Sequence, residues 1–351
     1  MTDATTLACP VPASRYDRVV LGHGSGGTLS LSLLRDIFLA AFDDLALHRL
    51  EDAAVLGAPP PGARIAMTTD GFVVTPAVFP GGDIGVLAVA GTVNDLAVSG
   101  ARPAYLTAAF VLEEGTPLEL LRTVARSMAE TARRAGVAIV AGDTKVVERG
   151  KGDGVFITTT GVGWVPEGRS LSSSAARPGD KVVVSGPLGD HGIAVLSVRE
   201  DLGFDTELVS DVAPLTGLVE AALEACPTIR CMRDPTRGGL ASALTELAEA
   251  SDVGVVLDEA ALPLRPAVRA ACELLGLDPL YVACEGRFVA IVPEADAPRL
   301  LEALRRHELG RDAAIVGSVT ELHAGRIALD CITGGKRWVL RLAGEQLPRI
   351  C

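Results

Sequence analysis

One apolar stretch with glycines at both ends, residues 81–100, constrains the fold of this 351-residue chain more than any other. Its apolar residues recur at intervals of three and four, which predicts a helix with one face in a hydrophobic core. These residues are Ile84, Leu87, Ala88, Val93, Leu96 and Ala97. The same stretch carries Asn94 and Asp95, and burying either without a partner would cost about 1–3 kcal/mol. We therefore expect their side chains to bond to backbone or to face an ion or ligand.

Two more aspartates follow short apolar runs on either side of this predicted helix. Asp70 comes after the run 64–67, and Asp143 comes after the run 137–140. Each run predicts a strand, so both carboxylates are expected where a strand ends. Carboxylates that separate elements deliver to one edge suit a Mg²⁺–phosphate site, because Mg²⁺ takes one or two carboxylates together with phosphate oxygens and water.

A glycine-rich segment, residues 22–27, precedes a second helical pattern from about residue 29 to 42. Its spacing matches the dinucleotide-binding pattern G-x-G-x-x-G. It is equally compatible with a flexible lid whose backbone amides close over phosphates. The plain alternative is a loop and a helix N-terminus, with Thr28 or Ser30 as the cap.

The length and patterning predict an α+β protein with two domains and a separate tail. The predicted parts are a mobile leader 1–17, an N-terminal domain 18–165, a linker 166–180, a C-terminal domain 181–343 and a tail 344–351. The net charge is −12 and the basic residues are scattered, which excludes a nucleic-acid partner. Because no apolar run is long enough to span a membrane, we expect a cytoplasmic protein without a membrane contact.

The seven cysteines show no C-x-x-C pair, so the sequence suggests neither a disulfide framework nor a zinc site. Most should be small buried hydrophobic residues, and Cys351 at the last position is the exception. Asp234 stands beside a proline and ahead of the pair Gly238 and Gly239. That position suits a helix cap as well as it suits a ligand.

Several motifs taken together closely resemble the HypE family of hydrogenase maturation proteins. They are GHGSGG at 22–27, TTDGF at 68–72, FPGGDIG at 79–85, GTVNDLAVSGA at 91–101, AGDTKVVERG at 141–150, DPTRGGL at 234–240 and PRIC at 348–351. The family belongs to the superfamily of aminoimidazole ribonucleotide (AIR) synthetase, selenophosphate synthetase and thiamine-monophosphate kinase. The resemblance spans nearly the whole chain from about residue 18.

This resemblance implies a two-domain AIR synthetase-like (PurM-like) fold, a homodimer, and ATP bound in a groove between the domains with Mg²⁺. It implies a carbamoyl dehydratase: a carbamoyltransferase, HypF, loads the C-terminal cysteine, and ATP-dependent dehydration gives a thiocyanate. The cyanide then passes to a HypC–HypD complex for the iron of [NiFe]-hydrogenase.

The resemblance also implies roles for individual residues. Cys351 would be the acceptor, Lys145 would steady the transferred phosphoryl group, and Glu285 would be the base for the substrate nitrogen. The metal ligands would be Asp52, Asp70, Asp95 and Asp143. The nucleotide contacts would be Gly24, Gly26, Gly27, Asp70, Asn94, Thr144, Asp234 and Arg237.

Three other functions fit parts of the sequence. An ATP-dependent synthetase or kinase of the same superfamily would act on a free small molecule and would not need Cys351. A nucleotide-binding scaffold without catalysis would use the tail to dock a partner. A nicotinamide dehydrogenase would rest on the glycine segment alone.

Overall fold

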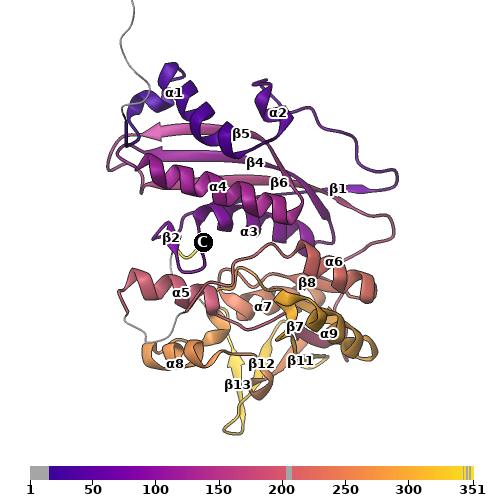
Figure 1. Cartoon of the computed structure of the whole chain (residues 1–351). Coiled ribbons are helices and arrows are strands. Elements are labelled where there is room, and N and C mark those ends of the chain that lie inside the picture. The colour runs from indigo at the N-terminus through magenta and orange to yellow at the C-terminus, as the bar shows by residue number, and fades with distance from the viewer. Residues whose placement is uncertain (1–15, 203–207, 343, 345–346, 348) are drawn as a thin grey trace, which may run out of the picture.

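The computed structural model describes residues 16–202, 208–342, 344, 347 and 349–351. Most of the predicted leader, residues 1–15, lies outside the described residues. The chain forms two large sheets with helices between and around them (Figure 1). The first sheet uses strands from residues 64–165 and the second uses strands from residues 181–339.

The N-terminal sheet has four strands in the order β1-β6-β4-β5. They are β1 (Arg64–Phe72), β4 (Arg102–Glu113), β5 (Ala138–Val147) and β6 (Val155–Val165). Only β4 and β5 run parallel, because the helix α4 (Leu118–Ala135) crosses over between them. A short hairpin of β2 (Val78–Phe79) and β3 (Gly82–Asp83) leads into the central helix.

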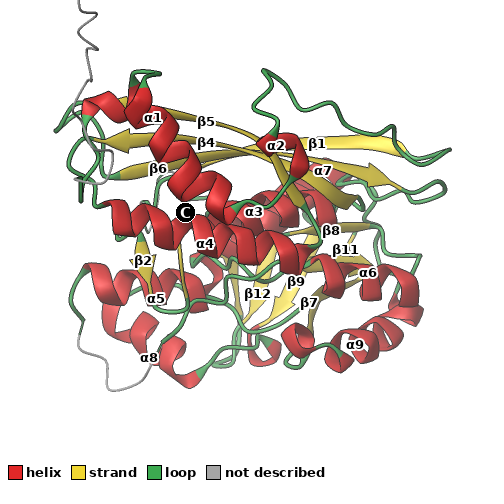
Figure 2. Ribbon diagram, turned by 45° about the horizontal axis from the view of Figure 1, so that its top comes forward, coloured by secondary structure: helices red, strands yellow, loops and turns green. Residues whose placement is uncertain are grey.

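Helices cover one face of this sheet (Figure 2). The central helix α3 (Ile84–Val98) packs on β1, β6 and β4, and α4 packs on α3. Near the edge strand β5 lie η1 (Leu21–Gly24), α1 (Thr28–Leu33), the π-helical turn η2 (Leu34–Leu39) and α2 (Leu45–His48). In the described part of the chain no helix covers the opposite face, where Ile65 and Met67 are 63% and 70% exposed.

The predicted central helix is confirmed, but the expectation of one buried face is wrong. Thirteen of its fifteen residues are buried, and Val86 and Asp95 are the two that are not. The reason is that α3 lies between the two domains, with the four-stranded sheet on one side and α6 (Thr216–Ala225) and β8 (Cys231–Arg233) on another. Its N-terminus is capped by Asp83, whose carboxylate accepts from the backbone N–H groups of Gly85 and Val86.

The expectation that Asp70 and Asp143 end their strands is also wrong. Asp70 lies inside β1, opposite Thr159 of β6, and Asp143 lies inside β5, opposite Ala109 of β4. β1 therefore continues through Asp70 to Phe72. The backbone hydrogen bonds of the ladder continue through both aspartates, and this pairing outweighs the low strand propensity of Asp and Gly.

The C-terminal sheet has seven strands in the order β13-β12-β9-β11-β7-β10-β8. Besides β8 they are β7 (Lys181–Val184), β9 (Gly254–Asp258), β10 (Val289–Val292), β11 (Ala314–Thr320), β12 (Ile327–Asp330) and β13 (Lys336–Val339). α7 (Gly239–Ser251) packs against β9, β10 and β12, while α9 (Ala297–Arg306) packs with α6 and against β7 and β11. α5 (Asp190–Arg199) contacts α8 (Pro266–Leu275) and β2, so it lies at the junction of the domains.

The glycine segment does not form the dinucleotide-binding unit. A 3₁₀ turn, η1, occupies the position where that motif requires a strand. Neither Thr28 nor Ser30 caps α1, whose N-cap residue is Gly27 without a side-chain bond. The Ser30 hydroxyl instead accepts from the Gly26 N–H at 2.9 Å and donates to the Gly22 carbonyl at 3.3 Å. The segment is therefore a loop held by Ser30.

The C-terminal end of the chain folds back between the two domains, beside β2, α3 and α5 (Figure 1). Ile350 is buried in the core of the N-terminal domain, and Leu347 and Cys351 pack against that core. Across the described residues, no helix has both the length and the hydropathy needed to cross a membrane.

Candidate functional site

Three carboxylates from three separate elements line one cavity between the domains. Asp70 comes from β1, Asp95 from α3, and Asp234 from the loop between β8 and α7. The cavity has a volume of about 530 Å³, and residues 171–173 of the predicted linker close one side of it. Asp70 lies on the face of the sheet that α3 covers, because its register partner Thr159 is buried there.

Threonine hydroxyls orient the first two carboxylates. Thr68 donates to Asp95 Oδ2 at 2.9 Å, and Thr92 lies 3.3 Å from Asp70 Oδ2. Thr92 is one turn of helix away from Asp95 and belongs to the polar cluster noted in the sequence. The cluster thus serves to hold acidic side chains at the cavity.

Two carboxyl groups of this cavity, those of Asp95 and Asp234, resist ionisation. Burial raises the pKa of Asp95 to about 6, and the negative charge of Asp70 adds to the effect. Burial likewise raises the pKa of Asp234 to about 7, with Asp95 as the next cause. Arg233 acts in the opposite direction on both. Negative groups so close together, with too little positive charge beside them, mark a site for a cation.

Glu285 lies next to this group in the turn before β10 and is only 2% exposed. In the described part of the chain its Oε1 has no hydrogen-bond partner. Burial raises its pKa well above the usual range, Asp234 and Asp211 raise it further, and Arg237 opposes them. A buried carboxyl with an unpaired oxygen and a high proton affinity suits an acid–base role.

The side chain of Asn94 ties the central helix to the turn that carries Glu285. Its Nδ2 donates to the carbonyls of Ala213 at 3.1 Å and Glu285 at 3.3 Å, and its Oδ1 accepts from the Leu215 N–H at 2.7 Å. The Glu285 N–H in turn donates to Asp211 Oδ1 at 3.1 Å. Asn94 is buried and these bonds use its amide group, so in this structure it positions the turn. Its contact with a nucleotide stays a prediction.

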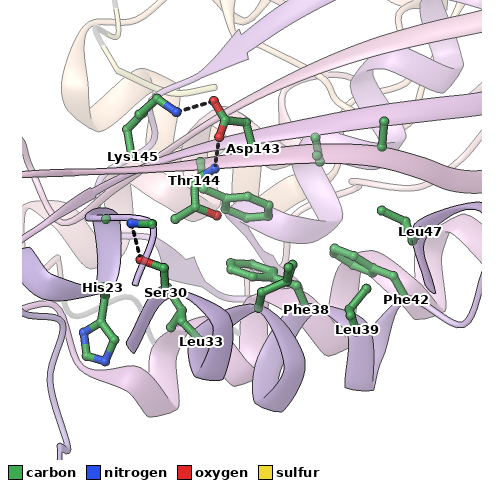
Figure 3. Close-up of a pocket in the computed structure, with 17 residues that line it drawn as sticks. His23, Ser30, Leu33, Phe38, Leu39, Phe42, Leu47, Asp143, Thr144 and Lys145 are labelled. Carbon is green, nitrogen blue, oxygen red and sulfur yellow. Dashed lines mark hydrogen bonds and ion pairs between the residues drawn. The ribbon is translucent and has the colours of Figure 1, made fainter. Parts of the chain in front are cut away.

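A second cavity, of about 290 Å³, collects another part of the predicted set (Figure 3). Gly24 and Gly26 line it from the glycine segment, and Thr144 and Lys145 line it from β5. Apolar side chains form its floor, among them the rings of Phe38 and Phe110, whose centroids are 4.5 Å apart. Gly24 packs so closely on β5 that a Cβ atom there would lie 2.9 Å from the Val146 nitrogen.

Asp143 and Lys145 form an exposed ion pair at the rim of this second cavity (Figure 3). Lys145 Nζ lies 2.6 Å from Asp143 Oδ2, and this hydrogen bond is the main cause that lowers the pKa of Asp143. Asp143 stands opposite Ala109 of β4. Ala109 lies between Ala108 and Phe110, whose side chains are buried on the face that the helices cover. Because side chains alternate along a strand, Asp143 and Lys145 project from the face that no helix covers.

The four predicted metal ligands therefore do not meet at one edge within a single chain. Asp70 and Asp95 lie together, whereas Asp143 lies on the opposite edge strand and the opposite face, roughly 14 Å away across three strand spacings. Asp52 is exposed in the loop between α2 and β1. Among the described residues no three such side chains cluster closely enough to hold a metal by themselves.

Cys351 docks within its own chain, near the first carboxylates. Its backbone carbonyl accepts from the Val73 N–H at 3.1 Å. Val73 is three residues beyond Asp70, roughly 10 Å along an extended chain. A further cavity of about 280 Å³ is lined by Arg237 together with Leu347 and Ile350 of the tail. The structure thus holds the backbone of the predicted acceptor cysteine against the segment that follows β1, and places its neighbour Ile350 on a cavity wall shared with Arg237.

Sequence reasoning missed three residues at this site. Arg233 is the cation that opposes the high pKa of both Asp95 and Asp234, and its place directly before the noted DPTRGGL motif was the available signal. Asp211 positions Glu285, and His191 contacts the tail. Neither stands in a recognisable pattern, so only the folded chain could identify them. Gly27 forms the N-cap of α1 and does not line the cavity of Gly24.

Two family models match this chain. The model described as AIR synthase related protein, N-terminal domain, matches residues 50–165, and the corresponding C-terminal domain matches residues 177–330. A curated relative from Cupriavidus necator, the carbamoyl dehydratase HypE, is 56% identical over 334 residues, covering 95% of this chain and 95% of that protein.

Solved structures show the same likeness. A crystal structure of the hydrogenase maturation protein HypE in complex with ATP superposes with a TM-score of 0.91 at 46% identity, over 95% of this chain and 99% of that one. A chain of a HypE–HypF complex structure superposes with a TM-score of 0.77 at 48% identity, over 89% of this chain and 100% of that one.

Proposed function

The chain belongs to the HypE family of hydrogenase maturation proteins, and we propose that it dehydrates a carbamoyl group carried on its own Cys351. It is an enzyme, a carbamoyl dehydratase of hydrogenase maturation. The product on Cys351 is a thiocyanate, the source of the cyanide ligands of the iron in [NiFe]-hydrogenase. ATP drives the reaction, and a relative of 46% identity crystallised in complex with ATP supports this.

The observation that carries the proposal is the docked tail. A dehydratase that acts on its own C-terminal residue must bring that residue to its phosphate-binding groups. Here the Cys351 carbonyl bonds to Val73, just beyond Asp70, and Ile350 lines a cavity with Arg237. A kinase or synthetase for a free small molecule would leave this space to its substrate, so the docked tail argues against that alternative.

The residues of the first cavity fit Mg²⁺. Mg²⁺ is bound by one or two carboxylates and completes its octahedral shell with phosphate oxygens and water. Asp70 and Asp95 supply two carboxylates, and a cation would offset the burial and the neighbouring negative charge that raise the pKa values of Asp95 and Asp234. Bound there, Mg²⁺ would neutralise charge on the ATP phosphates.

Dehydration needs ATP because an amide oxygen is a poor leaving group. The carbamoyl oxygen attacks the γ-phosphorus of ATP, and the bond from that phosphorus to the oxygen of ADP breaks. The nitrogen then loses both protons while the carbon–oxygen bond breaks, and phosphate leaves with that oxygen. One proton ends on the phosphate and the other is released, so the thiocyanate, ADP and phosphate account for all the atoms.

Glu285 is the base that we propose for the nitrogen protons. Its high proton affinity favours proton uptake once its carboxylate is ionised, and its unpaired Oε1 is available to the substrate. Burial is the main cause of the raised pKa of Glu285, and a cation beside Asp70 and Asp234 would weaken the repulsion that adds to it. Binding of a cation at the phosphate site would in this way lower the pKa of Glu285, so that its carboxylate could accept a proton. Arg237, on the wall shared with the tail, would hold the transferred phosphoryl group.

We propose a homodimer that buries the uncovered face of the N-terminal sheet. That face exposes Ile65 and Met67 and also carries Asp143 and Lys145. Within one chain these two charged residues lie far from Cys351, so a second copy must supply them if Lys145 is to steady the phosphoryl group. The exposed Asp52 would also have to come from a second copy of the chain if it is to act as a metal ligand.

The proposed partners are the protein that loads the carbamoyl group and the complex that receives the cyanide. A carbamoyltransferase, HypF, loads Cys351, and a relative of 48% identity was crystallised in a HypE–HypF complex. A HypC–HypD complex receives the cyanide.

Intact-mass measurement tests the proposed function. The protein is incubated with the carbamoyltransferase, carbamoyl phosphate and ATP, and then with Mg²⁺ added or withheld. We expect the mass to rise by one carbamoyl group and then to fall by one water, with peptide mapping placing both changes on Cys351. A mass that never changes, or an adduct on another residue, would contradict the proposal.

The acidic cavity also predicts how stability depends on pH. Asp95 and Asp234 have raised pKa values in the folded state, so the folded protein binds more protons than the unfolded chain between about pH 4 and pH 7. Their contribution to stability is therefore largest below pH 4 and is lost as the pH rises through 6 to 7. We expect thermal unfolding to show that Mg²⁺ raises the Tm more at pH 8 than at pH 5.5. An equal shift at both pH values would contradict a cation site at these carboxylates.

A further inference from the structure

A buried histidine holds the docked tail by its backbone. His191, at the start of α5, has its Nε2 atom 2.8 Å from the carbonyl oxygen of Ile350. Its ring is fully buried, and the edge of the Phe79 ring packs against it with centroids 5.3 Å apart. Phe79 belongs to β2 of the N-terminal domain, so His191 touches both domains and the tail at once.

The contacts of both ring nitrogens show which nitrogen carries the proton. Nδ1 lies 2.8 Å from the hydroxyl of Ser210, and this oxygen accepts from the Val212 N–H at 3.0 Å. A carbonyl oxygen can only accept, so Nε2 must be the protonated nitrogen that donates to Ile350. Burial lowers the pKa of His191, and the neutral ring then takes the Ser210 hydrogen at Nδ1. The Ile350 carbonyl thus fixes the tautomer, and Ser210 satisfies the other ring nitrogen.

The neighbouring tail carbonyls are held as well. The guanidinium group of Arg199, on the same helix as His191, donates to the carbonyls of Arg349 and Thr75. The Cys351 carbonyl accepts from Val73, and the Thr75 N–H donates to the Arg349 carbonyl at 3.4 Å. Each of the last three residues therefore has its carbonyl bonded to an element outside the tail.

Recognition of this kind does not depend on what the cysteine sulfur carries. The bonds fix the backbone on both sides of the Cys351 α-carbon. A thiol, a carbamoyl thioester and a thiocyanate would all fit the same backbone contacts. Arg349 has φ of 54°, which turns the chain so that the carbonyls of Ile350 and Cys351 reach His191 and Val73.

We propose that His191 is a positioning residue of the dehydration step, which with Ser210 and Arg199 seats the tail at the phosphate site and releases it for loading. The role in dehydration rests on the proposed function. The docking of the tail by these residues does not, because it is a property of the folded chain. A carbamoyltransferase needs the tail outside, and dehydration needs it inside. Contacts to carbonyls and to side chains other than the cysteine sulfur suit a tail that must dock in several chemical states.

Alkylation of Cys351 measures the seating directly. The full-length protein without ATP is treated with iodoacetamide, and the modified peptides are quantified by mass spectrometry. His191→Phe keeps a flat ring in the cavity but removes the donor. We expect Cys351 to react roughly fivefold or more faster in this variant, the change that corresponds to one lost hydrogen bond. Cys331, which is also half-buried, serves as the internal reference and should not change.

The conservative variant separates positioning from a merely structural effect. The amide nitrogen of glutamine reaches the place of Nε2, so His191→Gln should restore slow alkylation of Cys351 and most of the dehydration rate. His191→Phe should slow single-turnover dehydration at least tenfold, and loading by the carbamoyltransferase should be at least as fast as in the unmodified chain because the tail is more often outside. His323→Phe, which alters a ring that contacts Trp338, is the matched control and should change neither rate.

Two outcomes would overturn the inference. One is a His191→Phe protein that unfolds at the usual temperature and alkylates Cys351 as slowly as the unmodified chain. The other is a folded His191→Gln protein that behaves like His191→Phe. If His191→Phe fails to fold, Arg199→Met replaces it, since it removes the donor to the Arg349 carbonyl, and the same alkylation criterion applies. Alkylation requires neither ATP nor the carbamoyltransferase, so its result is independent of whether the proposed function holds.

Discussion

We expect Cys351→Ala to abolish thiocyanate formation while ATP binding stays unchanged. The variant lacks the sulfur that would carry the carbamoyl group, so the substrate is missing and no slow residual reaction should remain. ATP binding should persist because the bond from the Val73 N–H is accepted by the backbone of residue 351, which the substitution keeps. The measurements are intact mass after incubation with the carbamoyltransferase and ATP, and nucleotide affinity by calorimetry.

Cys331→Ala is the matched control for this experiment. Cys331 is half-buried like Cys351, but it follows β12 in the C-terminal sheet, away from the tail. It should load and dehydrate as the unmodified chain does. An enzyme for a free small molecule would keep full ATP turnover with its soluble substrate after Cys351→Ala. That result would remove the role proposed for the tail.

The arrangement of the site was only partly accessible from the sequence. The helix α3 and its polar cluster were predicted because apolar periodicity depends on local spacing alone. That Asn94 would bind backbone across the domain boundary was not predictable, since Ala213, Leu215 and Glu285 are distant in the chain. The sequence predicted that the Asn94 side chain would bond either to backbone or to a ligand. In the folded chain it bonds to backbone.

The four aspartates show a different limit. The sequence places Asp70 and Asp143 in similar positions, each after an apolar run. The order of strands separates them, because β1 and β5 are the opposite edges of the sheet. The alternation of side chains along a strand separates them further, because the two carboxylates lie on opposite faces. Neither property can be read from one strand by itself. A residue pattern can therefore identify ligands without showing which of them act together in one chain.

The described site combines carboxyl groups on fixed elements with an acceptor cysteine on a tail that can move. Asp70, Asp95 and Glu285 sit on β1, on α3 and on a turn held by Asn94 and Asp211. The acceptor Cys351 sits on a short segment held by hydrogen bonds to its carbonyls, by the ion pair of Arg349 with Asp153, and by the packing of Ile350 and Leu347. Fixed acid–base groups with a movable carrier are what a reaction needs when its substrate is loaded elsewhere and processed inside.

Glu285→Gln should slow dehydration by about 10²–10⁴-fold, the usual contribution of a general base. The change keeps the shape of the side chain, and the bonds that position residue 285 involve only its backbone, so the turn should stay in place. Loading of Cys351 and ATP binding should be nearly unchanged. Single-turnover formation of thiocyanate on a preloaded tail, followed by mass spectrometry, measures the effect without interference from the loading step.

The pH dependence supplies the sharper form of this prediction. The pKa of Glu285 is raised well above its ordinary value, and a base acts only when it is ionised, so the unmodified rate should fall as the pH drops through that raised pKa. Glu285→Gln should lose this dependence. Glu294→Gln, which alters an exposed ion pair with Lys181, is the control and should keep both the rate and the profile. A Glu285→Gln enzyme that retains the full rate and the same pH profile would show that another group takes the protons. Asp234 would then be the next carboxyl to test, because it lies in the same acidic group and its pKa is raised to about 7.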